Sequence, residues 1–207
     1  QGRPSVVQRP EEATPLVQVT TFAGQEEEGH ADGAGAEAMF LFPCAVAFAP
    51  DGTLFICDAR NHCIREATPD GVVTTLAGQP GAPGLADGAG AAARFSCPCF
   101  IAVSPDGSTL FVCDRDNHCI RRVTRGGEVS TFAGNGENGD VDGMGAAARF
   151  HRPQGIACGP DGVLFVCDSG NHCIREISAA GEVTTLSGGT EGYADGAGRD
   201  ARFCCPF

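Results

Sequence analysis

The stretch Leu164-Phe-Val-Cys-Asp-Ser-Gly-Asn-His-Cys-Ile-Arg-Glu-Ile177 occurs three times in the chain, and its other copies are residues 54–67 and 110–123. In each copy an apolar run meets an Asp and a short polar segment that ends in Asn-His. Cys-Ile-Arg and alternating polar and apolar residues follow. This pattern is typical of a strand, a tight turn and a second strand. An isolated hairpin is only marginally stable in water, so we expect neighbouring copies to cover its faces.

Other motifs repeat with the same period of about 55 residues. Pro-Asp-Gly begins at Pro50, Pro105 and Pro160, and Asp-Gly-x-Gly begins at Asp32, Asp87, Asp142 and Asp195. One unit therefore holds an apolar strand at residues 45–49, a Pro-Asp-Gly turn, the hairpin, and a β-branched strand at residues 72–76. Four short antiparallel strands per unit are the make-up of a β-propeller blade, so the predicted fold class is all-β.

The third unit carries the full set of repeated residues. It reads Pro153-x-Gly-Ile-Ala, then Pro-Asp-Gly-x-Leu-Phe-Val-x-Asp-x-x-Asn-His-x-Ile-Arg-x-Ile, then Gly-x-Val-Thr-Thr-Leu-x-Gly. This series closely resembles the NHL repeat, in the subtype with a long Asp-Gly-x-Gly connector between blades. The resemblance covers residues 17–207. It implies a β-propeller of four-stranded antiparallel blades, typically six in a ring, of which this chain holds three full blades.

The chain departs from the family pattern in its cysteines. Cys57 and Cys63, and their copies, stand where such repeats usually have Ala and Arg.

The repeats predict where each segment of the chain begins and ends. Residues 1–15 are rich in Pro, Gln and charge and are expected to be a flexible lead-in. Residues 16–40 are expected to hold an orphan outer strand, at residues 16–22, and a connector with a short helical turn. Blade 1 is predicted at residues 41–95, blade 2 at 96–150, blade 3 at 151–203, and the start of a further blade at 204–207.

The composition argues against two classes of partner. The 207 residues include 26 acidic and 14 basic side chains, which give a formal net charge of −12. A negative surface repels phosphate backbones, so nucleic acid is not an expected partner. No apolar run approaches the roughly 18 residues of a membrane span, and no signal-peptide pattern opens the chain. These observations assign no compartment.

The number of predicted blades determines whether they can close into a ring. A propeller is protected from edge pairing only when its blades close into a ring. Three sectors of a six-sector ring leave two bare flanks, so either the chain is part of a longer propeller or two copies complete one ring. A separate half-ring is expected to expose apolar surface and to self-associate. The orphan strand at residues 16–22 offers another edge for pairing with a second copy.

Polar residues that every unit repeats are expected to serve the fold. They are Asp58, Asp114 and Asp168; Asn61, Asn117 and Asn171; His62, His118 and His172; and Arg65, Arg121 and Arg175. We expect the arginines to pair with Asp or to lie between blades, with contact to a ligand as the alternative. A ring of metal-binding histidines is disfavoured because hairpin tips on successive blades diverge. No metal or other cofactor is predicted.

Residues that differ between units are better candidates for binding. They lie in the polar turn of the hairpin and just before each first strand, which in propellers starts near the central channel. The candidate partner-binding residues are Arg60, Arg115, Asp116, His151, Arg152 and Gln154.

The chain has twelve cysteines. Cys57 and Cys63 flank a five-residue turn, so they could face one another across the hairpin within disulfide range. The same holds for Cys113 with Cys119 and for Cys167 with Cys173. The alternative is that they are small buried apolar residues. Zinc is disfavoured because Cys97-Pro-Cys99 and Cys204-Cys205 lack the usual gap between ligands, and no Cys has a positioned His that would indicate a nucleophile.

The predicted function is that of a non-enzymatic scaffold whose faces bind a protein partner. The alternative, implied by related propellers, is part of a metal-dependent hydrolase or lyase of the lactonase type. Such an enzyme needs Glu, Asp or Asn side chains that converge on a divalent cation at the channel, and the first two units supply none there.

Overall fold

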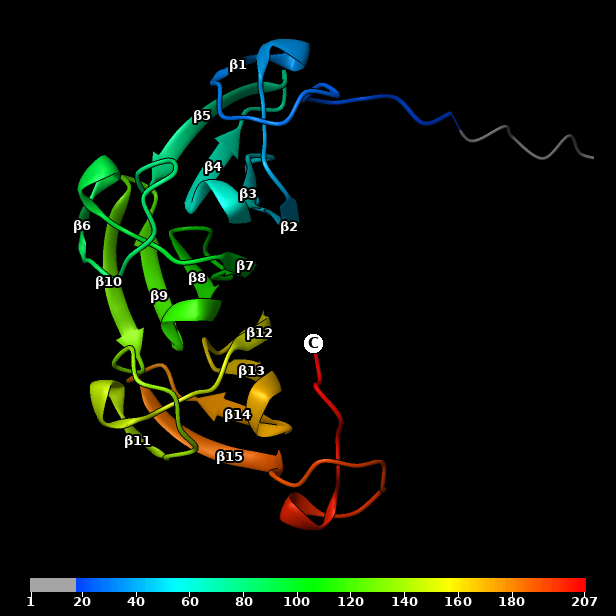
Figure 1. Ribbon diagram of the computed structural model, residues 1–207, viewed down its shortest axis with the longest axis vertical. Helices are drawn as coiled ribbons and strands as arrows, with labels where there is room; N and C mark the ends of the chain where they lie inside the picture. Colours follow the sequence, from blue (N-terminus) through cyan, green and yellow to red (C-terminus); the bar gives the residue numbers. More distant parts are fainter. Residues whose placement is uncertain (1–17) are drawn as a thin grey trace, which may run out of the picture.

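The computed structural model describes residues 18–207, so the lead-in predicted for residues 1–15 lies outside the described residues. Three antiparallel sheets follow one another along an arc (Figure 1). In each sheet the first long strand lies on the concave side of the arc and the fourth lies on the convex side (Figure 1). The all-β prediction of propeller blades is confirmed.

The three sheets share one strand order. Blade 1 contains β2 (Pro43–Phe48), β3 (Leu54–Asp58), β4 (Cys63–Ala67) and β5 (Val72–Ala77). Blade 2 contains β7 (Pro98–Val103), β8 (Thr109–Asp114), β9 (Cys119–Thr124) and β10 (Glu128–Ala133). Blade 3 contains β12 (Pro153–Cys158), β13 (Leu164–Asp168), β14 (Cys173–Ile177) and β15 (Glu182–Gly188).

Each sheet also has a fifth strand that the sequence analysis did not predict. These strands are two residues long and come from the connector before each blade: β1 (Gly33–Ala34), β6 (Gly88–Ala89) and β11 (Gly143–Met144). They pair with the outer long strand of the following blade, β5, β10 and β15 respectively. The Asp-Gly-x-Gly motif therefore adds an edge strand and ties each connector to the next blade.

The connectors hold the short helical turns that the sequence predicted. Each is a 3₁₀ helix of three residues directly after the short strand: η1 (Gly35–Glu37), η3 (Gly90–Ala92) and η5 (Gly145–Ala147). A fourth, η7 (Gly198–Asp200), follows blade 3.

The orphan strand predicted over residues 16–22 is wrong for its described part, because residues 18–22 adopt no strand. The equivalent strands β5, β10 and β15 each pair with the third long strand of their own blade. A strand needs a neighbour to satisfy its backbone hydrogen bonds, and residues 18–22 have no such neighbour in the part of the chain that the structure describes.

The hairpin turns are single 3₁₀ turns, η2 (Ala59–Asn61), η4 (Arg115–Asn117) and η6 (Ser169–Asn171). The residue in the left-handed region is the His that follows, with φ of 57° at His62, 53° at His118 and 55° at His172. The Asn stays in the 3₁₀ turn because its side chain is held by Asp58, or by the equivalent Asp in the other blades.

The hairpin register contradicts the possible disulfides and agrees with the alternative of small buried residues. In blade 1, Asp58 lies opposite Cys63 and Cys57 lies opposite Ile64. The two cysteines are therefore offset by one residue, and successive side chains of a strand point to opposite faces. Blades 2 and 3 have the same register, so Cys113 does not face Cys119 and Cys167 does not face Cys173. All twelve thiols are free in the described chain, and most of these six are buried.

Apolar cores form between neighbouring blades. Phe55 and Cys57 of blade 1 pack with Ile101, Leu110 and Val112 of blade 2. The interface between blades 2 and 3 repeats this packing with the equivalent residues. No helix within residues 18–207 is long and apolar enough to cross a membrane.

The two ends of the arc leave equivalent surfaces uncovered. Val46 in β2 is 60% exposed, whereas its counterpart Ile101 in β7 is 7% exposed. At the other end Phe165 in β13 is 39% exposed, whereas its counterpart Phe55 in β3 is fully buried. We call these surfaces the first flank and the last flank.

Candidate functional site

A buried cluster of polar side chains lies at the base of each hairpin turn. In blade 1, Asp58 accepts hydrogen bonds from Asn61 Nδ2 (2.8 Å) and Arg65 Nη1 (2.9 Å) through one carboxylate oxygen. Its other oxygen accepts the backbone N–H of Leu41 (2.8 Å), in the connector. Asp58 and Arg65 are both fully buried. Blades 2 and 3 repeat the pair as Arg121–Asp114 (2.9 Å) and Arg175–Asp168 (2.8 Å).

The same arginine fastens the connector to the blade. Arg65 Nη2 donates to the carbonyl of Ala31 (2.7 Å) and to Asp32 Oδ1 (2.8 Å). Its guanidinium carbon lies 5.0 Å from the ring centroid of Phe40, within range of a cation–π interaction. Asp32 also accepts a hydrogen bond from Thr75 Oγ1 (2.9 Å). We call the repeated Asp, Asn and Arg, together with the connector Asp, the connector clamp.

Burial and hydrogen bonds shift the pKa values of the clamp carboxyl groups in opposite directions. Burial alone would raise the pKa of Asp32, but hydrogen bonds from Thr75 and Arg65 outweigh it and hold that pKa below its usual value. Burial raises the pKa of Asp114 to about 6, although Arg121 and Asn117 oppose the shift. Asp32 and Asp114 are thus each paired with an arginine of their own clamp.

A cluster of Asp140, Asp168 and Cys173 brings three metal-ligating groups together. The guanidinium of Arg175 already occupies the cationic position there, since Nη1 lies 2.8 Å from Asp168 and 3.5 Å from Asp140. This cluster therefore shares Asp168 with the connector clamp of blade 3.

Each repeated histidine binds the backbone of the following blade. His62 Nδ1 accepts the N–H of Cys97 (3.1 Å), and His118 Nδ1 accepts the N–H of Arg152 (3.1 Å). His172 does the same with Cys205 (3.2 Å). An Nδ1 that accepts an N–H assigns the ring proton to Nε2. Burial lowers the pKa of His62 and His118, which favours this neutral form.

Hydrogen bonds also join each turn to the dipeptide before the first strand of its own blade. The backbone N–H of Arg60 donates to the carbonyl of Leu41 (3.1 Å) and that of Asp116 to Ser96 (3.1 Å). In blade 3 the N–H of Gly170 donates to the carbonyl of His151 (2.8 Å). Together with the histidine bonds, these contacts link turns 59–62, 115–118 and 169–172 and dipeptides 41–42, 96–97, 151–152 and 204–205 into one continuous belt. We call this belt the rim.

Five of the six predicted partner-binding residues lie on the rim. Arg60 is exposed above the ring of Phe42, with 5.1 Å between the guanidinium carbon and the ring centroid. Arg115 is half-buried, with Nη1 3.8 Å from Cys97 Sγ and 3.6 Å from the carboxylate of the exposed Asp116.

The candidates of blade 3 lie on the next sector of the same belt. The ring of the half-buried His151 is 5.7 Å from that of His118. Arg152 is exposed, and Gln154 is half-buried one residue inside β12, beyond the rim itself.

The second position of each first long strand is occupied by Cys44, Cys99 and Gln154. The Cys44 thiol lies 3.1 Å from the carbonyl oxygen of Cys99, in the neighbouring blade. Burial raises the pKa of Cys44 to about 11, so its thiol stays protonated near neutral pH. These positions thus carry no carboxylate that could hold a divalent cation.

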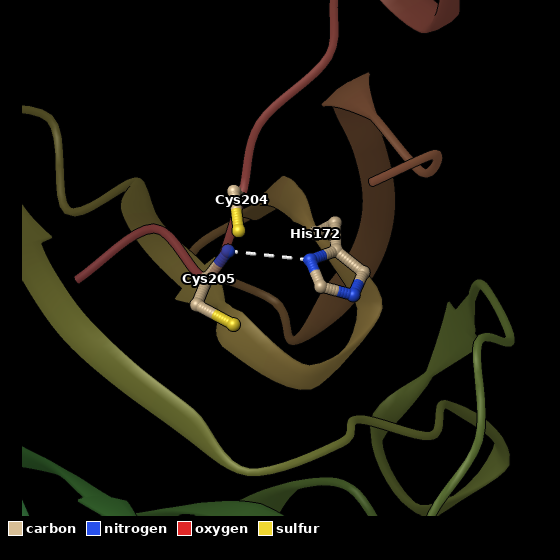
Figure 2. Close-up of side chains that lie close together, drawn as sticks. All are labelled: His172, Cys204 and Cys205. Carbon is tan, nitrogen blue, oxygen red and sulfur yellow. Dashed lines mark hydrogen bonds between the residues drawn. The ribbon is translucent and has the colours of Figure 1, made fainter. Parts of the chain in front are cut away.

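One cluster escaped the sequence analysis, which found no Cys with a positioned His and disfavoured zinc at Cys204-Cys205 on the spacing of the two cysteines alone. His172 in the turn of blade 3 lies beside Cys204 and Cys205, which come from the connector that follows (Figure 2). The signal that could have revealed it is the repeat itself. Cys97 follows His62 by 35 residues and Cys205 follows His172 by 33, and in both places the His accepts the N–H of the Cys.

Comparison with known proteins agrees with this architecture. Residues 23–191 match the family model of the Teneurin NHL domain. The chain belongs to the NHL-repeat family. Among relatives of this NHL chain, Teneurin-m of Drosophila melanogaster is 33% identical over 172 residues, which are 76% of this chain and 6% of that protein. The NHL repeat-containing protein 2 of Bos taurus is 30% identical over 180 residues, covering 80% of this chain and 24% of that protein.

A third relative is the chloroplastic protein SUPPRESSOR OF QUENCHING 1 of Arabidopsis thaliana. It is 28% identical over 204 residues, which are 91% of this chain and 19% of that protein. This NHL chain therefore spans less than a quarter of the length of each of these three relatives.

Solved structures show the same fold. An auxiliary nutrient binding protein of Bacteroides thetaiotaomicron superposes with a TM-score of 0.64 at 25% identity, covering 83% of this chain and 42% of that one. A chain of a nidogen/laminin complex superposes with a TM-score of 0.55 at 18% identity, covering 73% of this chain and 50% of that one.

Proposed function

We propose that this NHL chain is a non-enzymatic scaffold whose rim binds a protein partner. One observation carries the proposal: the polar residues that all blades repeat make contacts within the fold, whereas five of the six candidates that differ between blades lie on the rim. Arg65 and its copies are fully buried, and the histidines bind the next blade. Arg60, Asp116 and Arg152 are exposed. A surface that varies along a rigid frame suits recognition of a particular partner.

The charges of the rim indicate the chemistry of that partner. Each blade places one arginine on the rim, at Arg60, Arg115 and Arg152, although the whole chain has a formal net charge of −12. Arginine is enriched at protein interfaces and binds carboxylates through two donors at once. We infer that the partner presents an acidic segment to the rim. Asp116 repels any partner carboxylate placed beside it, so it restricts which acidic segments bind.

The lack of carboxylates at the starts of the first strands supports the non-enzymatic part of the proposal. A divalent-cation enzyme of the lactonase type needs oxygen ligands that converge at the channel. Cys44, Cys99 and Gln154 stand there instead, and the thiols of Cys44 and Cys99 approach backbone carbonyls of the neighbouring blade.

The test measures binding of a fluorescent peptide rich in Asp and Glu to the 207-residue chain. A variant with Arg60→Glu, Arg115→Glu and Arg152→Glu is compared with a control of equal charge change, Arg122→Glu, Arg199→Glu and Arg202→Glu, whose exposed arginines are not among the rim residues. We expect the rim variant to lose roughly 3- to 150-fold in affinity, since each of the three exposed ion pairs contributes about 0.2–1 kcal/mol. The control is expected to bind nearly as the parent does.

Two outcomes would contradict the proposal. One is equal loss of affinity in the rim variant and the control. The other is tighter binding of a single-stranded RNA of the same length and charge than of the acidic peptide, which would indicate recognition of phosphate rather than of a protein.

A further inference from the structure

We propose that His172, Cys204 and Cys205 form a zinc-binding site at the end of the rim (Figure 2). One ligand atom from each residue, an imidazole nitrogen and two sulfurs, lies within 4.8 Å of the other two. In tetrahedral zinc sites the same atoms are about 3.6–3.8 Å apart, given Zn–S and Zn–N distances of about 2.3 and 2.0–2.1 Å. Each pair therefore needs to close by about 1 Å at most, and both cysteines are exposed, so side-chain rotation is enough.

The donor set suits zinc rather than magnesium or calcium. Two thiolates and an imidazole are the ligands that zinc prefers, whereas magnesium and calcium prefer oxygen. Binding converts both thiols to thiolates and releases two protons to solvent. The ion and its three ligands then carry no net charge, because two thiolates balance one divalent cation and the imidazole is neutral.

Glu191 lies next to Cys204. The Cys204 thiol donates a hydrogen bond to Glu191 Oε1 across 3.5 Å, so the carboxylate can pass the proton of this thiol on to solvent. Water fills the fourth zinc position.

The ion would compete with one existing contact. His172 Nδ1 now accepts the N–H of Cys205, and a neutral imidazole has one lone pair to give. A single neutral hydrogen bond is weak beside a set of metal–ligand bonds, so zinc displaces the N–H from that nitrogen.

The equivalent places on the rim show why only this one has the full donor set. Beside His62 stand Ser96 and Cys97, which offer one thiol. Beside His118 stand His151 and Arg152, where the guanidinium repels a cation. The positions beside His62 and His118 therefore serve as matched controls for the site beside His172.

The experiment titrates cobalt(II), a spectroscopic substitute for zinc, into the reduced 207-residue chain. We expect one equivalent to give a thiolate-to-cobalt charge-transfer band and the strong visible absorption of a tetrahedral site, and zinc to abolish both. Cys204→Ser and Cys205→Ser are each expected to weaken binding by about 100-fold or more, since even residues that only orient metal ligands cost about 10–100-fold. Cys97→Ser, at the equivalent blade position, is expected to bind as the parent does.

The two serine variants lie on an exposed segment, so their near-ultraviolet circular dichroism should match that of the parent. Absence of cobalt binding by the parent would overturn the proposal. So would binding that Cys204→Ser and Cys205→Ser leave unchanged, or that Cys97→Ser reduces equally, because either result places the ion on other thiols.

Discussion

The buried arginine explains why one side-chain type recurs at Arg65, Arg121 and Arg175. A lysine has one donor group, whereas the planar guanidinium of Arg121 reaches Asp114, Asp87 and two backbone carbonyls while its face lies on Phe95. Burying an ion pair contributes little net stability compared with apolar packing, but losing one partner leaves the other charged and unpaired. The clamp is therefore sensitive to any single change.

We predict that Arg121→Ala lowers the free energy of unfolding by about 3–5 kcal/mol, because Asp114 is left buried without its partner. Urea denaturation followed by circular dichroism measures the change. Arg122→Ala, the neighbouring arginine whose side chain is exposed, is the control and should cost less than about 0.5 kcal/mol. Similar losses in both variants would show that the buried pair has no special role.

At the scale of the elements, the end of each outer strand lies close to the histidine turn of the same blade. Gly134 follows β10 with φ of +90°, and a Cβ there would lie 2.8 Å from the carbonyl oxygen of His118 and 2.9 Å from Cys119 Cα. Both are backbone atoms, so neither can rotate away from the added Cβ. The left-handed histidine turn and the end of the outer strand thus approach closely at a position that only glycine fits.

Gly134→Ala is predicted to destabilise the chain by clearly more than Gly145→Ala. Gly145, in η5, also has positive φ (+51°), but the nearest atom to its Cβ would be 3.8 Å away. The Gly145 variant should therefore cost only the left-handed strain of about 1–2 kcal/mol. Thermal unfolding of the two variants compares them, and equal melting temperatures would mean that the close approach is unimportant.

The whole molecule is an open arc with two complementary flanks. The first flank holds a groove of about 450 Å³ lined by Phe22, Val46, Phe48 and Leu54, together with Gly52 and Pro69. Its counterpart in blade 2 packs against the face of blade 1 that includes Phe55. The last flank presents Phe165, the equivalent of Phe55, so the flank of one copy matches the opposite flank of another.

We predict that the 207-residue chain self-associates through these flanks, because burial of apolar surface favours assembly. Phe48→Glu should shift the mass measured by light scattering after gel filtration toward the monomer, since it places a charge in the first flank. Met144→Glu, an equally drastic change at an exposed residue of the outer strand β11, should leave the assembly intact. A monomeric parent chain at high concentration would rule the prediction out.

Much of the fold followed from local pattern. The period of about 55 residues and the alternation of apolar residues depend only on neighbours along the chain, so they predicted the long strands of the blades and the short connector helices. Residues repeated in every blade, such as Asp58 and Arg65, were also expected to be structural because each blade needs them equally. The two-residue strands β1, β6 and β11 were too short to show an alternation of apolar residues.

The sequence by itself determined the blade, its repeat and the positions that vary between blades. The tertiary structure alone decided the hairpin register that separates Cys57 from Cys63, the bond from each histidine to the next blade, and the meeting of His172 with Cys204 and Cys205. The physical reason is distance along the chain. Periodicity records which face a residue occupies, whereas register and contacts across more than thirty residues depend on how complete blades pack together.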